Sequence, residues 1–275
     1  MKNSIFQIFA GGLLILLQFS SCKKDSVSKS SDSVTTGGVS AIGFFTATGN
    51  GSVKVDGVVK QRGICWSTRE FPNVSDFVTI DPHPGSGSFS NVLVGLDPST
   101  KYWVRAYAST DAGNIYGDEV SFTTPTIVLG QSLLNGIVFF LDSLGHHGLI
   151  AAPADQGTIG WSNAANVTTN ATSETDGLAN TGMISDVQGD APPYAASICM
   201  DLESNGVFFI WYLPSKNQLD LMYKTKDIIG GFSDNIYWSS TENDTNNAWA
   251  QDFSNGSAAI GNKTTGYHVR AIRAF

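Results

Sequence analysis

The sequence predicts two folded domains, a mainly β first domain and an α+β second domain. Only 15% of the 275 residues are charged, and short apolar runs alternate with clusters of Gly, Pro, Asn and Asp. This pattern predicts short strands separated by tight turns. The hydrophobic content of 41% is enough to give each of two domains its own core.

Residues 1–21 have the composition of a secretory signal peptide. Lys2 is followed by an apolar run, residues 5–19, that is shorter than the roughly 20 residues a transmembrane helix needs. Two serines then precede Cys22, and the letters FSSC resemble the lipobox of bacterial lipoproteins. The resemblance implies that Cys22 carries the lipid that anchors the mature chain. We expect this anchor to lie in the outer membrane of a Gram-negative bacterium, with the protein exposed at the cell surface; the leaflet is left open. An ordinary secretory signal is the alternative.

Residues 22–33 are rich in serine and lack apolar periodicity, so we expect a flexible tether between the lipid and the first domain. The letters DSV occur twice, with Ser26 and Ser33 at their centres. These triplets resemble the O-glycosylation sites of some Gram-negative surface lipoproteins. The resemblance makes Ser26 and Ser33 candidate glycosylation sites.

Residues 34–124 have strand-like runs at the spacing of a β-sandwich. The letters LDPSTKYW, from Leu96 to Trp103, resemble the tyrosine corner of fibronectin type III domains, with Tyr102 as the corner residue. The resemblance implies an immunoglobulin-like β-sandwich. We expect Trp66 to lie in its core. Arg62-Gly63 continues to Ile64, so an integrin-type Arg-Gly-Asp loop is absent, and a spacer role is favoured.

Residues 127–275 form the second predicted domain, which follows the strand-breaking Pro125. The letters WYLPSKNQLDLMY, residues 211–223, place Ser215 three residues before Gln218, and this spacing predicts a capped helix start. Leu219 and Met222 should then face inward.

Four segments of the second domain resemble, in order and spacing, the Lcl C-terminal domain family and its formylglycine-generating relatives. The segments are WYLPS (211–215), YWSSTE (237–242), AWAQDFSNGSA (248–258) and YHVRAIRAF (267–275). The resemblance implies a C-type-lectin-like α+β domain whose first and last strands, within 136–142 and 268–275, pair directly. Tyr212 stands where the family has Arg, which puts the role of that Arg in doubt here. Asn255-Gly256 predicts a type I′ hairpin turn.

The sequence shows no catalytic constellation, so we do not expect an enzyme. The formylglycine-generating relatives use cysteines near the end of the domain, whereas the only cysteine here is Cys199, well upstream. Cys65 and Cys199 lie in apolar patterns that predict buried, unreactive thiols. His146 and His147 are adjacent and would point to opposite faces of a strand, so they cannot chelate a metal together.

The candidate ligand loop consists of Glu242, Asn243, Asp244, Asn246 and Asn247. These side chains could hydrogen-bond sugar hydroxyls, ligate calcium through oxygens, or form a solvated turn. The motifs of calcium-dependent lectins, Glu-Pro-Asn and Trp-Asn-Asp, are absent, so we expect no cofactor, with calcium as the alternative.

A net charge of -8, with the 16 Lys and Arg residues scattered, argues against nucleic-acid binding. The sequence therefore favours a surface lipoprotein that acts as a binding or adhesion module, with a glycan or an extracellular protein as its ligand. There are two alternatives: a structural spacer without a specific ligand, and an accessory component of glycan capture.

Overall fold

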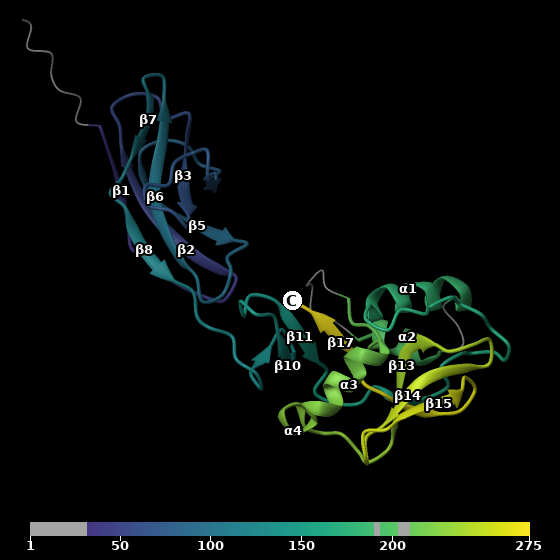
Figure 1. Ribbon diagram of the computed structural model, residues 1–275. Helices are drawn as coiled ribbons and strands as arrows, with labels where there is room; N and C mark the ends of the chain where they lie inside the picture. Colours follow the sequence, from purple (N-terminus) through teal and green to yellow (C-terminus); the bar gives the residue numbers. More distant parts are fainter. Residues whose placement is uncertain (1–31, 190–192, 203–209) are drawn as a thin grey trace, which may run out of the picture.

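The computed structural model describes residues 32–189, 193–202 and 210–275. These residues form two lobes joined end to end (Figure 1). The expected signal peptide, Cys22 and Ser26 lie outside the described residues. In the part of the chain that is described, no helix is long and apolar enough to cross a membrane.

The first domain is a sandwich of two antiparallel sheets. One sheet has the order β1-β2-β5, and the other has the order β4-β3-β6-β7, with β8 also pairing with β6. The strands are β1 (Ser33–Thr36), β2 (Thr46–Lys54), β3 (Gln61–Ser67), β4 (Phe77–Val78), β5 (Gly87–Val94), β6 (Lys101–Thr110), β7 (Gly113–Tyr116) and β8 (Val120–Thr123). This sheet division is the one expected for a fibronectin type III-like domain.

The core of the sandwich confirms two predictions about aromatic residues. Trp66 is buried and stacks on Phe77 with ring centroids 5.7 Å apart. The Tyr102 hydroxyl accepts a hydrogen bond of 2.8 Å from the backbone N–H of Asp97, which is the predicted tyrosine corner. Burial raises the pKa of Tyr102, because the phenolate would be poorly solvated there.

The strand register places the two ends of the first domain at opposite poles. Ser33 pairs with Lys54 at one end of β2, whereas Thr46 pairs with Val94 at the other end. The second domain lies beyond the Thr46 end, since Phe45 contacts Phe275 there. The β1 end, which follows the predicted tether, therefore faces away from the second domain (Figure 1).

The described residues of the second domain form two further sheets. The first has the order β17-β11-β10-β9, and the second has the order β12-β16-β13-β14-β15. The strands are β9 (Ser132–Leu133), β10 (Gly136–Leu141), β11 (Gly148–Ala151), β12 (Gly157–Ile159), β13 (Ile236–Glu242), β14 (Asn247–Asp252), β15 (Ala258–Asn262), β16 (Tyr267–Val269) and β17 (Ile272–Ala274). Together with the helices, they make this domain α+β.

The helices of the second domain are α1 (Gly177–Gln188), α2 (Ala195–Met200), α3 (Lys216–Lys224) and α4 (Lys226–Ile229). Helix α3 begins as predicted. The Ser215 hydroxyl accepts from the backbone N–H of Gln218, and the Gln218 side chain accepts in return from the backbone N–H of Ser215, at 2.9 Å. Leu219 and Met222 are buried, which confirms the predicted inward face.

The expected pairing of the first and last strands of the domain is wrong. The last strand, β17, pairs with β11, and β11 separates it from β10. The reason is local, because β10 and β11 form a hairpin through a turn at Asp142, whose carboxylate accepts from the backbone N–H groups of Leu144 and His146. The free edge of β11 is then the one left for β17.

The turn between β14 and β15 also differs from the prediction. The two strands form the expected hairpin, but only Gly256 of the Asn255-Gly256 pair has a positive φ, of 82°. A type I′ turn needs positive φ at both central residues. The connection is instead a longer loop in which the Gly256 N–H donates to the Asp252 carbonyl at 2.7 Å.

Both predicted free thiols are buried and unpaired. Burial raises the pKa of Cys65 to about 11 and raises the pKa of Cys199 as well. Neither thiol is therefore primed as a nucleophile at neutral pH.

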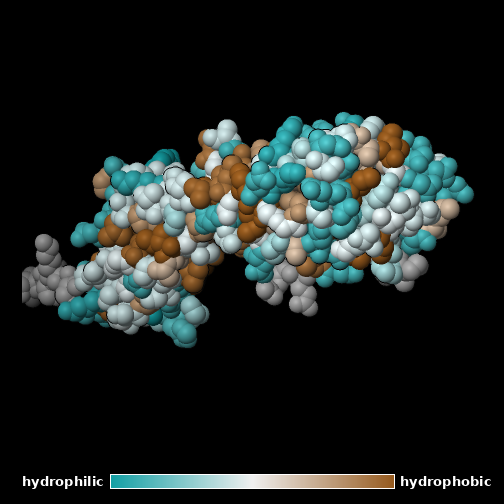
Figure 2. All heavy atoms as spheres, turned by 90° about the horizontal axis from the view of Figure 1, so that it is seen from below, coloured by the Kyte–Doolittle hydropathy of each residue, from teal (hydrophilic) through white to brown (hydrophobic). Residues whose placement is uncertain are grey.

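The two domains touch through aromatic and polar side chains. The rings of Phe45 and Phe275 are 6.3 Å apart, and Phe44 and Phe45 both pack against the core of the second domain. Thr100 Oγ1 lies 3.5 Å from His146 Nε2. Figure 2 shows hydrophobic side chains near the junction between the lobes, so the junction is in part an extension of the second core.

Candidate functional site

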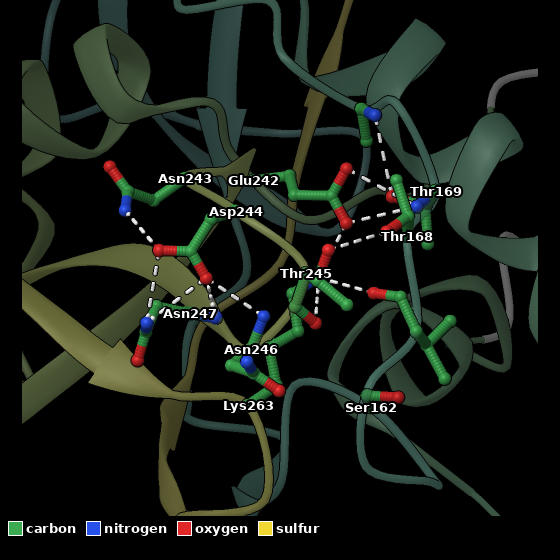
Figure 3. Close-up of polar contacts among 12 residues, drawn as sticks. Ser162, Thr168, Thr169, Glu242, Asn243, Asp244, Thr245, Asn246, Asn247 and Lys263 are labelled. Carbon is green, nitrogen blue, oxygen red and sulfur yellow. Dashed lines mark hydrogen bonds and ion pairs between the residues drawn. The ribbon is translucent and has the colours of Figure 1, made fainter.

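The predicted ligand loop joins β13 to β14 at one end of the five-stranded sheet. Asn243, Asp244, Thr245 and Asn246 are exposed, whereas Asn247 is half-buried at the start of β14. The structure thus brings four of the five predicted side chains to one exposed loop (Figure 3). Glu242 is the exception.

The Asp244 carboxylate organises this loop. It accepts from the backbone N–H groups of Asn246 (2.8 Å) and Asn247 (2.9 Å). It also accepts from the side-chain amides of Asn247 (3.0 Å) and Asn243 (2.8 Å). The Asn247 side chain and the Asn246 backbone hold the pKa of Asp244 below its ordinary value, because these bonds favour the charged carboxylate.

Glu242 does not share the exposed face of the loop. The pairing register of β13 with β14 shifts between Trp238 and Glu242. The Glu242 backbone N–H donates to the carbonyl of Ala171 at 2.8 Å. Its carboxylate is buried and accepts from the backbone N–H groups of Thr169 (2.9 Å) and Asn170 (2.7 Å). Glu242 therefore supports the loop from beneath and is not placed to contact a ligand.

Lys263 is the partner of Glu242, and sequence reasoning missed it. Only 1% of Lys263 is exposed, and its ammonium group forms an ion pair with the Glu242 carboxylate. The same group donates to the carbonyls of Val167 (2.6 Å) and Thr245 (3.2 Å) and lies 4.6 Å from the centre of the Trp161 ring. Lysine is among the residues least often buried, so nothing in its local sequence indicates this role.

The exposed face of the loop carries amide and hydroxyl groups. The Thr245 and Thr168 hydroxyls lie 2.9 Å apart, and the Asn246 side chain has no hydrogen bond among the described residues. An amide offers both donors and an acceptor, which matches the hydroxyl groups of a sugar. Among the described residues, no group of three or more His, Cys, Asp or Glu side chains could hold a metal ion.

A second polar cluster, also missed from the sequence, centres on Asp155. Its carboxylate accepts from Arg270 Nε (2.6 Å) and the Tyr237 hydroxyl (2.8 Å), and lies 3.1 Å from His268 Nδ1. Burial is the largest cause of a raised pKa at Tyr237. Arg270 also donates to the carbonyl of Gly231 at 2.6 Å. These bonds tie three separate segments together, and they involve partners far apart in sequence.

Ser33, the described candidate for O-glycosylation, is exposed at the start of β1. Its glycosylation stays a prediction.

No protein-family model and no curated protein matches this chain. Solved structures that resemble parts of it include the sixth fibronectin type III domain of a human fibronectin type III domain containing protein, with 22% identity, a TM-score of 0.28 and coverage of 37% of this chain and 92% of that one. A fimbrial protein from Bacteroides ovatus has 14% identity, a TM-score of 0.40 and coverage of 82% and 66%. The sensor domain of the anti-sigma factor RsgI4 in Pseudobacteroides cellulosolvens has 16% identity, a TM-score of 0.29 and coverage of 36% and 100%.

The first domain is a fibronectin type III-like β-sandwich, as its strand order and its Tyr102 corner indicate. The C-type-lectin-like assignment of the second domain stays a prediction.

Proposed function

We propose that this chain is a lipid-anchored surface protein whose second domain binds glycans through residues 243–247. The observation that carries the proposal is the loop itself. It presents amide and hydroxyl groups to solvent, while its backbone is fixed by Asp244 from within.

The support beneath the loop strengthens the proposal. The Lys263 ammonium group bonds to the Thr245 carbonyl, and Glu242 bonds to the neighbouring segment at Thr169 and Asn170. A loop held in one conformation loses little entropy when it binds, so a glycan that is held mainly through its hydroxyl groups can still be bound specifically. The Glu242–Lys263 ion pair is costly to desolvate, and its hydrogen bonds to Thr245, Thr169 and Asn170 fix the loop against the neighbouring segment.

The first domain suits a spacer role within this proposal. Ser33 and the Phe45 junction lie at opposite ends of the nine-residue strand β2, a separation of roughly 30 Å at about 3.3 Å per residue. A tether that enters at the Ser33 end would hold the second domain away from the membrane. This geometry also favours the alternative, a spacer without a ligand, so the two roles must be separated by a binding assay.

A glycan-array screen tests the binding proposal. Residues 23–275 would be applied with and without EDTA, because the loop offers oxygen atoms that calcium could also use. We expect retention of a group of related glycans that is unaffected by EDTA. Absence of retention on every glycan would leave the spacer role, and loss of retention in EDTA would instead indicate calcium.

A separate assay tests the anchor. Cys22→Ala should move the protein from the detergent phase to the aqueous phase in detergent phase separation, because the lipid is lost. A variant that still partitions with detergent would contradict lipidation. Protease treatment of intact cells should degrade the wild-type protein, and full protection would contradict surface exposure.

A further inference from the structure

Arg273 is a buried cation without a carboxylate partner among the described residues. Four cationic side chains in this part of the chain are buried, and three of them form ion pairs with acidic residues: Arg62 with Asp81, Lys263 with Glu242, and Arg270 with Asp155. Arg273, with 1% of its surface exposed, forms none. A buried charge is normally paired, so the exception calls for a physical explanation.

The contacts of Arg273 satisfy only part of its guanidinium group. Nη2 donates to the carbonyl of Leu134, whereas Nε and Nη1 are buried and have no acceptor. The guanidinium carbon lies 4.8 Å from the centre of the Trp211 ring, and Trp211 Nε1 is also buried without an acceptor. Burial lowers the pKa of Arg273, because the charged form is poorly solvated. All the unmet groups are donors, so the missing partner is an acceptor.

Two hollows lie beside Arg273 and Trp211, and Asn135 lines both of them. One, of about 440 Å³, is lined by Trp211 together with Asn135, Pro153 and Gln156, and also by Asp201 and by Asp155, whose carboxylate is paired with Arg270. The other, of about 540 Å³, is lined by the β9–β10 turn and again by Pro153. Leu134, whose carbonyl holds Arg273, forms that turn with Asn135, and both have positive φ, of 48° and 66°. Trp211 therefore lines the first hollow and Leu134 lines the second, whereas Arg273 lines neither and contacts both residues from the interior.

We propose that Arg273 and Trp211 form a binding site for a carboxylate- or sulfate-bearing ligand that enters beside Asn135. A carboxylate or sulfate supplies negative charge and several acceptors at once, as the acidic partners do for the three other buried cations. Stacking on Trp211 offsets part of the cost of burying Arg273, but it satisfies none of the free N–H groups. The site lies at the sheet of β9, β10, β11 and β17, whereas the glycan-binding loop belongs to the other sheet of the domain.

The test measures thermal unfolding and tryptophan fluorescence during titration with sodium glucuronate, sodium sulfate or sodium chloride at equal ionic strength. Glucose is the uncharged match for glucuronate. The proteins are the wild type, Arg273→Lys, Arg273→Met, Trp211→Phe and the control Arg69→Met, whose arginine side chain is 83% exposed. Asn246→Ala is added because it alters the proposed glycan loop and leaves the Arg273 site unchanged, so the two sites can be told apart.

We expect glucuronate or sulfate, but not chloride or glucose, to raise the unfolding midpoint of the wild type, Arg69→Met and Asn246→Ala. Arg273→Lys should bind the same anion about 10-fold or more weakly, because lysine cannot replace the guanidinium fork. Trp211→Phe should also bind it more weakly, since the indole donor is lost.

Equal effects of all the salts, or an anion effect that persists in Arg273→Lys, would overturn the proposal. A wild type that responds to neither glucuronate nor sulfate would overturn it too, and a more stable Arg273→Met protein would then identify the arginine as a buried charge without a ligand. If Arg273→Met does not fold, the lysine and phenylalanine variants decide the outcome.

Discussion

The Lys263 ammonium group is buried against the Glu242 carboxylate, directly beneath the exposed loop 243–247 (Figure 3). This ion pair joins the segment at Val167 to the loop carbonyl of Thr245. The proposed binding surface thus depends on charges that no ligand would touch.

We predict that Lys263→Met lowers the free energy of unfolding by about 3–5 kcal/mol, because Glu242 is left as an uncompensated buried charge. Urea denaturation followed by circular dichroism measures the change. Lys101→Met is the matched control, since Lys101 is exposed and also lies over a tryptophan ring, at 4.5 Å from Trp103. A control change within about 0.5 kcal/mol is expected. Equal effects of the two substitutions would show that the Lys263 ion pair is not structural.

Tyr102→Phe removes the hydroxyl that accepts from the Asp97 N–H. We expect the first domain to lose about 1 kcal/mol of stability, which is the net contribution of one such hydrogen bond. Tyr267→Phe is the control, because the Tyr267 hydroxyl has no hydrogen bond to any described residue. The same denaturation measurement serves for both, and an unchanged Tyr102→Phe protein would argue against a stabilising corner.

The loop should lose its order in acid. The folded pKa of Asp244 lies below the ordinary value of 3.8, so its stabilising effect is present above that value and is lost as the pH falls through the lowered pKa. Amide NMR signals of Asn246 and Asn247 should shift together in this range, below pH 4. Asp244→Asn should abolish the titration, and signals that titrate unchanged in that variant would contradict the assignment to Asp244.

The core of the second domain extends across the junction to Phe45 of the first domain. A fragment of residues 126–275 contains its own core, but it lacks Phe45, which packs on Phe275. We therefore predict that Phe45→Ala in the full chain destabilises the second domain by about 1 kcal/mol, since Phe45 is only half-buried. Phe71→Ala, at a side chain that is 68% exposed, should have no measurable effect on the same calorimetric transition. A Phe45→Ala protein with an unchanged second transition would mean that the junction is not part of the core.

Local signals in the sequence predicted the elements that depend on neighbouring residues. The Ser215 to Gln218 capping box and the Tyr102 corner each involve partners within five residues, and both are present. The prediction for β17 was wrong because strand order depends on which edge remains free after the β10–β11 hairpin forms.

The candidate site was predictable only in part, for the same reason. The polar composition of residues 243–247 is visible in the sequence, whereas the support for that loop is not. Lys263 lies 21 residues from Glu242, and Asp155 lies 115 residues from Arg270. The burial of Arg273 could not be predicted from its local sequence either, because it contacts Trp211 and Leu134, which are distant in the chain.

The most direct test of the central claim is calorimetric titration of the glycan that the array retains most strongly. The comparison is between the wild type, Asn246→Ala and the control Asn114→Ala, an exposed asparagine of the first domain. Asn246→Ala removes an exposed amide but keeps the bonds of the loop, because only the Asn246 backbone takes part in them. We predict binding that is about 10-fold weaker for Asn246→Ala and unchanged for Asn114→Ala. Equal affinity of all three proteins would contradict glycan binding through this loop.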